Sequence, residues 1–355
     1  MTIFLFVIGG VLLITGAELL VRGSSRLAVA AGISPLVVGL TVVGFGTSSP
    51  ELAVSVGASL TGAADVAVGN VVGSNIANVL LILGLSAALA PLVVARRLIR
   101  LDVPLMVGVS VAVFALAADG RLGRLDGLLL AAGLAVYLVL TVRHSRRSEA
   151  RLALDDGAGV PGAGGPPGPW WRDALAVAVG LALLLLGARW LVAGAVAAAV
   201  TLGLSELVIG LTIVAIGTSL PEIATSALAT LRGERDIAVG NVVGSNLFNL
   251  LGVLGVAATV APGGVSVAPA ALAFDLPVML ATAVACLPVF FTGQAISRWE
   301  GWVFLGYYAA YLGYLLLAAA EHDALPFYSG ALTLFVLPIT VLTLAILVFR
   351  AWRRG

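Results

Sequence analysis

The sequence predicts an all-α membrane protein, a bundle of transmembrane helices, and two observations support this fold class. Of its 355 residues, 61% are hydrophobic and only 10% are charged, a composition that excludes a water-soluble globular fold. The apolar residues also fall in stretches of about 20, the length that an α-helix needs to cross a bilayer core of about 30 Å. Such stretches favour a helical bundle over a membrane β-barrel, whose strands are shorter and alternate in polarity.

Eleven membrane spans are predicted where apolar stretches end at glycine, proline or charged residues. The first set of five covers residues 3–21, 36–60, 66–90, 101–118 and 125–142. The second set covers residues 174–193, 206–231, 237–260, 270–291 and 301–319, and the eleventh span covers 329–349. The first residues lack a basic region and a cleavage site, so we expect them to be retained as the first helix.

A duplicated motif divides the chain into two related halves. The stretch DVAVGNVVGSNIAN at residues 65–78 matches DIAVGNVVGSNLFN at 236–249 in 11 of 14 positions. The same offset of 171 residues places GTSSPE at 46–51 on GTSLPE at 217–222. Because each half has five spans, an odd number, the second half must cross the membrane in the opposite direction. The sequence therefore predicts two inverted five-helix repeats, a ten-helix core, plus one extra C-terminal helix.

Four regions follow from this division. They are a first repeat at 1–142, a linker at 143–172, a second repeat at 173–320, and a C-terminal helix with a basic tail at 321–355. The linker is basic and then rich in glycine and proline, which is typical of a flexible connection.

The arginines predict the orientation of the chain, since all 19 basic residues are arginine. With the N-terminus outside, sixteen of them fall on the cytoplasmic side, and only Arg121 and Arg124 fall in an outer loop. This asymmetry follows the positive-inside bias. We therefore expect a multi-pass protein of the cell membrane with its N-terminus outside and its C-terminus in the cytoplasm.

Two glutamates, Glu51 and Glu222, lie near the middle of the second and seventh spans, each directly after a proline. An ionised carboxylate at the bilayer centre costs at least about 2.5–3.5 kcal/mol, so each one needs a proton, a partner or a metal ion. No arginine lies in either span to provide a partner. Pro50 and Pro221 also free carbonyl oxygens of the preceding turn, which a membrane tolerates only where protein or a polar cavity satisfies them. A bound cation would satisfy both needs.

Hydroxyl and amide side chains accompany both glutamates. They are Thr47, Ser48, Thr218 and Ser219 beside the prolines, and Ser74, Asn78, Ser245 and Asn249 on the neighbouring spans. Thr47 and Glu51 are four residues apart, as are Ser74 and Asn78, so each pair shares a helix face. An oxygen-rich set without sulfur or imidazole fits hard cations such as Ca²⁺ and Na⁺.

These motifs resemble both copies of the alpha repeat of the sodium/calcium exchanger family, GTS-x-PE followed by GN-x-x-GSN, over roughly residues 1–320. The resemblance implies that Glu51 and Glu222 are the central carboxylates shared by Ca²⁺ and Na⁺ sites. It also implies hydroxyl ligands from Thr47, Ser48, Ser74, Thr218, Ser219 and Ser245, an amide ligand from Asn78, and carbonyl ligands from Gly44 and Ala215. Some members carry an aspartate where this chain has Asn249, so one carboxylate of those members is absent here.

The resemblance implies a secondary antiporter that exchanges Ca²⁺ for Na⁺ by alternating access, and not an enzyme. Coupling to H⁺ or K⁺, or a passive cation channel, remains an alternative. An intramembrane hydrolase is disfavoured because neither histidine lies in a predicted span and the chain has no lysine to act as a base. We expect no cofactor, no nucleic acid and no obligate protein partner; the expected partners are Ca²⁺, Na⁺ and the lipid bilayer.

Other polar residues of the spans are assigned to structure. Glu18 and Arg22 are four residues apart, a spacing that predicts a helical ion pair. Asp102 and Asp275 each precede an apolar residue and a proline, which is typical of helix caps. The candidates for inter-helix hydrogen bonds that brace the site are Asn70 and Asn241.

Overall fold

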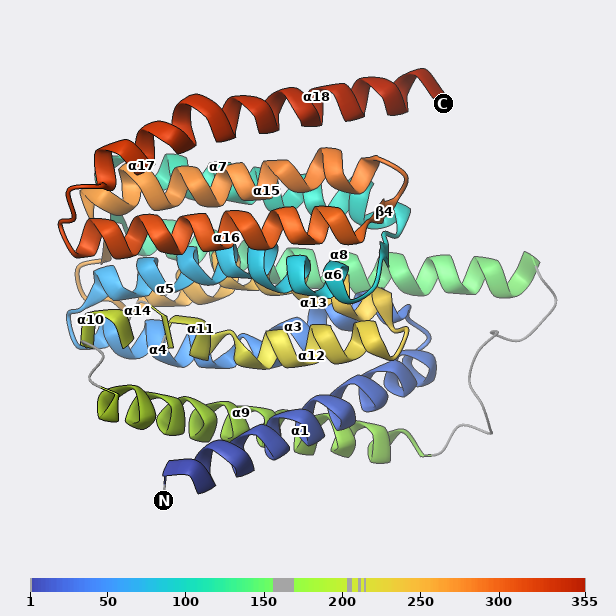
Figure 1. Cartoon of the computed structure of the whole chain (residues 1–355). Helices are drawn as coiled ribbons and strands as arrows, with labels where there is room; N and C mark the ends of the chain where they lie inside the picture. Colours follow the sequence, from blue (N-terminus) through green and yellow to red (C-terminus); the bar gives the residue numbers. More distant parts are fainter. Residues whose placement is uncertain (1, 156–168, 203–205, 210–211, 214, 355) are drawn as a thin grey trace.

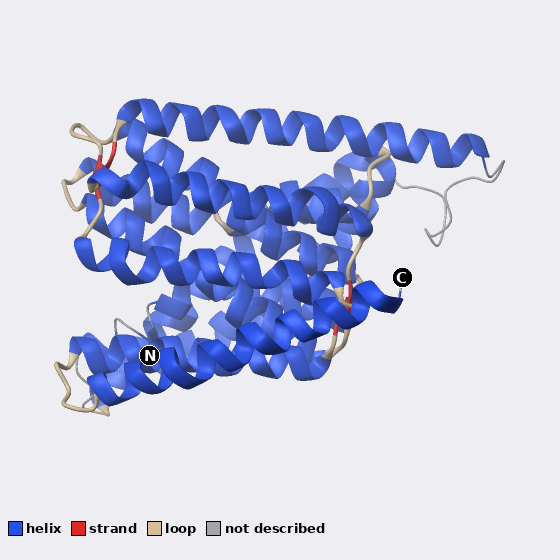
Figure 2. Ribbon diagram, turned by 90° about the horizontal axis from the view of Figure 1, so that it is seen from above, coloured by secondary structure: helices blue, strands red, loops and turns tan. Residues whose placement is uncertain are grey.

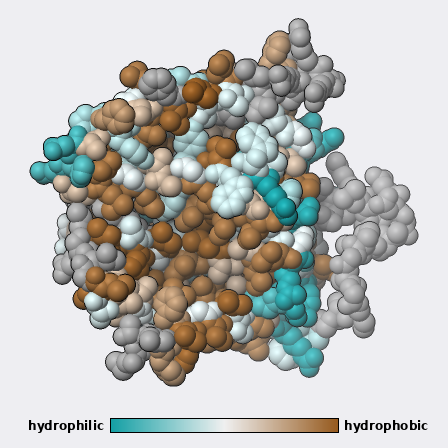
Figure 3. Space-filling model, viewed as in Figure 1, coloured by the Kyte–Doolittle hydropathy of each residue, from teal (hydrophilic) through white to brown (hydrophobic). Residues whose placement is uncertain are grey.

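The structure is a computed structural model that describes residues 2–155, 169–202, 206–209, 212–213 and 215–354. Long helices lie side by side along most of its length (Figure 1). Hydrophobic residues cover the middle of the face shown in Figure 3, and hydrophilic residues gather toward the two ends of the helices. In the described part, nine helices are long and apolar enough to cross a membrane, or ten if one bent pair counts as a single span. The chain is therefore a multi-pass membrane protein.

The first half follows the predicted order of spans. Its helices are α1 (Thr2–Ala31); α2 (Pro35–Val38), the π-helix η1 (Gly39–Val43), α3 (Gly44–Thr47) and α4 (Ser49–Leu60); α5 (Ala64–Ala77), the π-helix η2 (Asn78–Leu83) and α6 (Gly84–Leu89); the π-helix η3 (Leu98–Asp102), α7 (Val103–Leu116) and the short η4 (Ala117–Asp119); and α8 (Arg124–Asp155).

The second half repeats this pattern. Its helices are α9 (Trp170–Thr201); α10 (Glu206–Ile209), α11 (Ala215–Thr218) and α12 (Leu220–Leu231); α13 (Arg235–Leu247), the π-helix η6 (Phe248–Val253) and α14 (Leu254–Val260); the π-helix η7 (Ala271–Asp275) and α15 (Leu276–Phe291); and α16 (Arg298–Ala319). The predicted seventh span, 206–231, includes residues 210–211 and 214, which lie outside the described residues. The extra C-terminal helix consists of α17 (Leu325–Ala331), the π-helix η8 (Leu332–Val336) and α18 (Leu337–Arg354).

The predicted linker, 143–172, is not wholly a flexible connection, because α8 continues through Asp155 and α9 begins at Trp170. Residues 143–155 contain no glycine or proline and are rich in arginine, alanine and leucine, which are good helix formers. The glycine- and proline-rich part at 156–168 lies outside the described residues.

Two very short strand pairs connect the halves at opposite ends of the bundle (Figure 2). The strand β1 (Leu92–Val93) pairs with β4 (Ala295–Ile296), and β2 (Arg121–Leu122) pairs with β3 (Val265–Ser266), both antiparallel. Each pair joins a loop of one half to a loop of the other. We call residues at equivalent positions of the two halves mirror residues. In these terms β1 mirrors β3 and β2 mirrors β4, as an inverted repeat requires.

The helices α1 and α9 lie against each other at one edge of the bundle (Figure 1). Their contact depends on two glycines from each helix. Gly9 faces Gly187 and Gly16 faces Gly180, whereas by position in the repeat Gly9 mirrors Gly180 and Gly16 mirrors Gly187. A Cβ atom added to Gly16 would lie 2.5 Å from the backbone nitrogen of Leu184. The absence of side chains lets the two backbones approach closely, the usual role of small residues in membrane helices.

Asp102 and Asp275 are not helix caps, contrary to the prediction. Each lies where a π-helical turn continues directly into the next helix, and the wider turn accommodates the following proline without ending the helix. The Asp102 carboxylate accepts a hydrogen bond from Tyr137 (3.1 Å), and Asp275 accepts one from Tyr311 (2.8 Å). Arg97 adds an ion pair with Asp102 at 3.3 Å. These contacts tie the fourth span to the fifth and the ninth to the tenth.

Replacing Gly16 with alanine tests the contact between α1 and α9. We expect Gly16→Ala to destabilise the protein by about 1–3 kcal/mol, because the added methyl group overlaps the backbone of α9. Gly10→Ala is the matched control, since its Cβ would lie 3.9 Å from the nearest atom of another helix, a side-chain carbon of Leu191. The thermal midpoint in detergent measures the effect. Equal midpoints for the two variants would contradict this packing.

Candidate functional site

The second and seventh spans are both broken at a serine. Helix α3 ends at Thr47 and α4 begins at Ser49, and the two segments of this span meet at an angle of 45°. Ser219 separates α11 from α12 in the same way. Pro50 and Pro221 each stand at the start of the second segment, where the missing backbone donor is tolerated. The breaks therefore create two helix N-termini inside the membrane.

Glu51 and Glu222 lie in the first turns of these second segments, α4 and α12. The positive end of a helix dipole favours a negative charge at this position. Both side chains are buried, with 1% of each residue exposed. Neither glutamate forms an ion pair among the described residues. The acidic residues that do form ion pairs there are Glu18, Asp102 and Asp173.

Serine hydroxyls donate hydrogen bonds to both glutamates, and one of these bonds joins the two halves. Ser48 of the first half donates to Oε1 of Glu222 at 3.3 Å. Ser74 donates to Oε1 of Glu51 at 3.5 Å. Because Ser48 is three residues from Glu51 in the same span, its contact with Glu222 brings the two acidic segments together.

A third group of contacts joins α3 to α13. The Thr47 hydroxyl donates to Oδ1 of Asn241 (3.1 Å) and lies 3.5 Å from Oγ of Ser245. The Ser245 hydroxyl in turn donates to the carbonyl oxygen of Gly44 at 3.5 Å. Ser245 therefore links two other predicted ligands, the Thr47 hydroxyl and the Gly44 carbonyl.

Several buried polar atoms of this region have no hydrogen-bond partner among the described residues. They are Oε2 of Glu51, Oε2 of Glu222, Oγ of Ser219, Oδ1 of Asn78, and both amide atoms of Asn249. Unpartnered buried polar atoms are costly and uncommon in folded proteins. All but one of these atoms are oxygens, the ligand type that hard cations select. The donor set therefore fits a cation.

Thr218 and Ala215 mirror Thr47 and Gly44. Both lie on α11, and Thr218 is half-buried. Residues 210–211 and 214, which precede α11, lie outside the described residues.

No group of three or more His, Cys, Asp or Glu side chains that could hold a metal ion occurs within the described residues. A cation bound here would therefore depend on two carboxylates and on neutral oxygens.

The two ends of the site are packed differently. Gly240 and Gly244 of α13 are buried against the segment 36–44, and a Cβ atom on Gly244 would lie 2.6 Å from the carbonyl oxygen of Leu40. Their mirror residues on α5 are Gly69, which is exposed, and Gly73, which is half-buried. One end of the site is therefore closed by backbone contact, and the mirror surface at the other end is more open.

Asn70 and Asn241 form hydrogen bonds between helices beside the broken spans, as predicted from the sequence. Asn70 donates to Ser55 (2.9 Å) and to the carbonyl oxygen of Glu51 (3.2 Å). Asn241 donates to Ser226, the mirror of Ser55, at 2.9 Å. These bonds hold α5 to α4 and α13 to α12.

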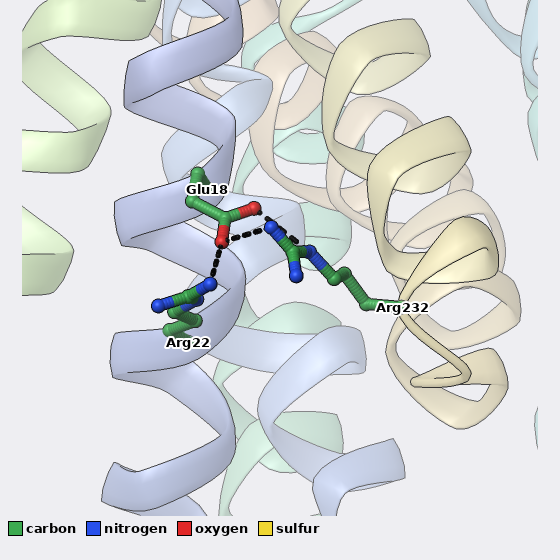
Figure 4. A network of polar contacts seen from close by, with 3 residues as sticks. All are labelled: Glu18, Arg22 and Arg232. Carbon is green, nitrogen blue, oxygen red and sulfur yellow. Dashed lines mark hydrogen bonds and ion pairs between the residues drawn. The ribbon is translucent and has the colours of Figure 1, made fainter.

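A separate polar network joins α1 to Arg232, the residue that follows α12 (Figure 4). Glu18 forms the predicted ion pair with Arg22. It also accepts hydrogen bonds from Arg232 Nε (3.1 Å) and from a second nitrogen of that guanidinium (2.5 Å). Arg232 could not be predicted as a partner, because it lies 214 residues away in the chain.

Removing the charge of Arg232 tests this network. We expect Arg232→Gln to lower stability by about 0.5–1 kcal/mol, because the ion pair is partly exposed. The difference should shrink at high salt, which screens exposed charges. Thermal midpoints at low and high ionic strength measure it. Arg235→Gln is the control, since no ion pair of Arg235 occurs among the described residues. Equal losses of stability in the two variants would contradict a specific contact between Arg232 and Glu18.

Comparison with known proteins assigns the chain to a family. The family model for sodium/calcium exchanger protein matches residues 1–143 and 173–317. CaxA of Alkalimonas amylolytica is 42% identical over 321 residues, covering 89% of this chain and 98% of CaxA. The sodium/calcium exchanger MaX1 of Methanosarcina acetivorans is 33% identical over 339 residues, covering 87% and 96%. The solved structure of a sodium/calcium exchanger from Methanococcus jannaschii matches with a TM-score of 0.75 and 29% identity, covering 88% and 97%. The chain belongs to the sodium/calcium exchanger family.

Proposed function

We propose that this chain is a secondary antiporter that exchanges Ca²⁺ for Na⁺ across the cell membrane. The single observation that carries the proposal is the pair of buried carboxylates, Glu51 and Glu222, one from each inverted half, beside buried oxygens without a hydrogen-bond partner. Its family is one of transporters rather than enzymes, which supports transport over catalysis.

The proposed ligands all bind through oxygen. They are the carboxylates of Glu51 and Glu222, the hydroxyls of Thr47, Ser48, Ser74, Thr218, Ser219 and Ser245, the amides of Asn78 and Asn249, and the carbonyls of Gly44 and Ala215. Ca²⁺ takes about six to eight oxygen ligands from such groups. Two carboxylates match the charge of one Ca²⁺ or of two Na⁺.

Obligatory exchange follows from the burial of this charge. A site with two ionised carboxylates and no cation would have to carry uncompensated charge through a low-dielectric interior, which is strongly unfavourable. A loaded site is nearly neutral. The conformational change is therefore favoured only when cations or protons neutralise the carboxylates, and Ca²⁺ and Na⁺ compete for these groups.

Alternating access is supported by the unequal packing at the two ends of the site. If the N-terminus lies outside, as the arginine distribution indicates, the closed end at Gly240 and Gly244 faces the cytoplasm. In inverted repeats, exchanging the conformations of the two halves opens the other end. The mirror surface at Gly69 and Gly73 would then close.

A transport assay tests the proposal. Vesicles containing the purified protein and loaded with Na⁺ should take up radiolabelled Ca²⁺ when the Na⁺ gradient points outward. Glu51→Gln and Glu222→Gln should each reduce the initial rate by about a hundredfold. Each change removes a carboxylate that would pair with the bound cation, and the loss of one partner of a buried ion pair costs about 3 kcal/mol. Glu321→Gln is the control, because Glu321 is an exposed residue outside the site.

The same vesicles separate the alternatives. Uptake driven by a K⁺ or H⁺ gradient but not by a Na⁺ gradient would show that another ion is coupled to Ca²⁺ transport. The proposed Ca²⁺ site would be unaffected by that result. Single-channel currents would identify a passive channel. Uptake that persists in both glutamine variants would overturn the proposed site.

A further inference from the structure

Asn75 and Asn246 complete the two copies of the GSN motif but are not among the proposed ligands. Both are buried, with 2% of each residue exposed. They are mirror residues, and both line one narrow internal crevice. Met106 and Met279, a second mirror pair, line the same crevice.

A chain of hydrogen bonds runs from this crevice to a proposed ligand. The amide nitrogen of Asn246 donates to the sulfur of Met106 at 3.4 Å. The amide nitrogen of Asn78 donates to Oδ1 of Asn246 at 2.9 Å. Asn78 lies one turn after Ser74, whose hydroxyl contacts Glu51, so both side chains lie on the face toward the glutamates.

The sulfur atom determines the direction of the whole chain. A thioether can accept a hydrogen bond but cannot donate one, so Asn246 must present its NH₂ group to Met106. Its carbonyl oxygen then faces Asn78 and requires a donor there. Asn78 must therefore use its own NH₂ group, which leaves its carbonyl oxygen as the free end. This oxygen is buried and has no hydrogen-bond partner among the described residues.

The mirror chain is not formed in this conformation. Met279, Asn75 and Asn249 mirror Met106, Asn246 and Asn78. Both amide atoms of Asn75 and both of Asn249 have no hydrogen-bond partner within the described part of the chain, although these residues are 2% and 1% exposed. The structure thus orients one amide of the site and leaves the other without an orienting bond.

We propose that Asn246, held by Met106, is a positioning residue that turns the carbonyl oxygen of Asn78 toward the transported cation. The inference rests on the proposed function, because it requires a cation at the site. The inference explains why a methionine, Met106, and a second asparagine, Asn246, lie behind the proposed ligands. It also makes the amide of Asn249, without its mirror partners, the less ordered ligand of this conformation.

Equilibrium binding of radiolabelled Ca²⁺ to the purified full-length protein in detergent tests the inference through a double-mutant cycle. Asn246→Leu should weaken Ca²⁺ binding by about tenfold, as the loss of an outer partner of a ligand does. Asn78→Ala removes the oxygen that Asn246 orients. The double variant should therefore bind Ca²⁺ as Asn78→Ala does, within about twofold.

Two methionine variants provide a matched comparison that preserves packing. Met106→Leu removes the acceptor with little change in volume and should weaken Ca²⁺ binding by a few-fold, roughly the effect of one hydrogen bond. Met279→Leu removes a sulfur of the same crevice that accepts no such bond from the described residues, and it should leave binding unchanged. This pair decides the question even if Asn246→Leu does not fold.

Independent effects of Asn246→Leu and Asn78→Ala that add in full would overturn the positioning role. So would equal affinities for Met106→Leu and Met279→Leu. Failure of the wild-type protein to bind Ca²⁺ is a different result, because it would overturn the proposed function itself and this inference with it.

Discussion

The structure depends on one constraint, the burial of two carboxylates in the membrane without a basic partner. Glu51 and Glu222 are each 1% exposed, and the ion pairs of the described residues involve other acids. Such groups are tolerated only when a proton, a partner or a cation neutralises their charge, and helix termini and hydrogen-bond donors reduce the remaining cost. The broken spans provide two helix N-termini at these residues, and Ser48 and Ser74 provide donors. A bound cation is the compensation that we propose for the rest of the charge, and Oε2 of each glutamate has no hydrogen-bond partner among the described residues.

The inverted repeat explains why the compensation is shared between the halves. Each half contributes one glutamate, one broken span and one GSN motif, and Ser48 of the first half contacts Glu222 of the second. The copies are nevertheless unequal in conformation. Gly240 and Gly244 are buried against a neighbouring backbone while Gly69 is exposed. The hydrogen bonds from Met106 to Asn78 are formed, whereas the described residues show none in the mirror position. Two related halves held in unequal conformations could exchange those conformations, which is what the proposed alternating access requires.

Hydrophobic length and the duplicated motif were sufficient to predict the helical class, the order of the spans and the inverted repeat. They also selected, in the GTS-x-PE and GSN stretches, side chains that the fold brings onto neighbouring helices. The errors arose where tertiary contacts decide. Asp102 looked like a cap because D-x-P commonly starts a helix, but a π-helical turn lets the helix continue to a bond with Tyr137. The paired strands are two residues long, too short for an alternating pattern. Asn246 had no visible role because its partners, Asn78 and Met106, are 168 and 140 residues away.

The most direct test of the central claim is a crystal structure of the protein grown in Ca²⁺, with anomalous differences used to locate the ion. The account predicts one Ca²⁺ within coordination distance of carboxylate oxygens from both Glu51 and Glu222, together with hydroxyl or carbonyl oxygens of the neighbouring segments. It would be contradicted by a map in which the two carboxylates face separate environments and no ion lies between them.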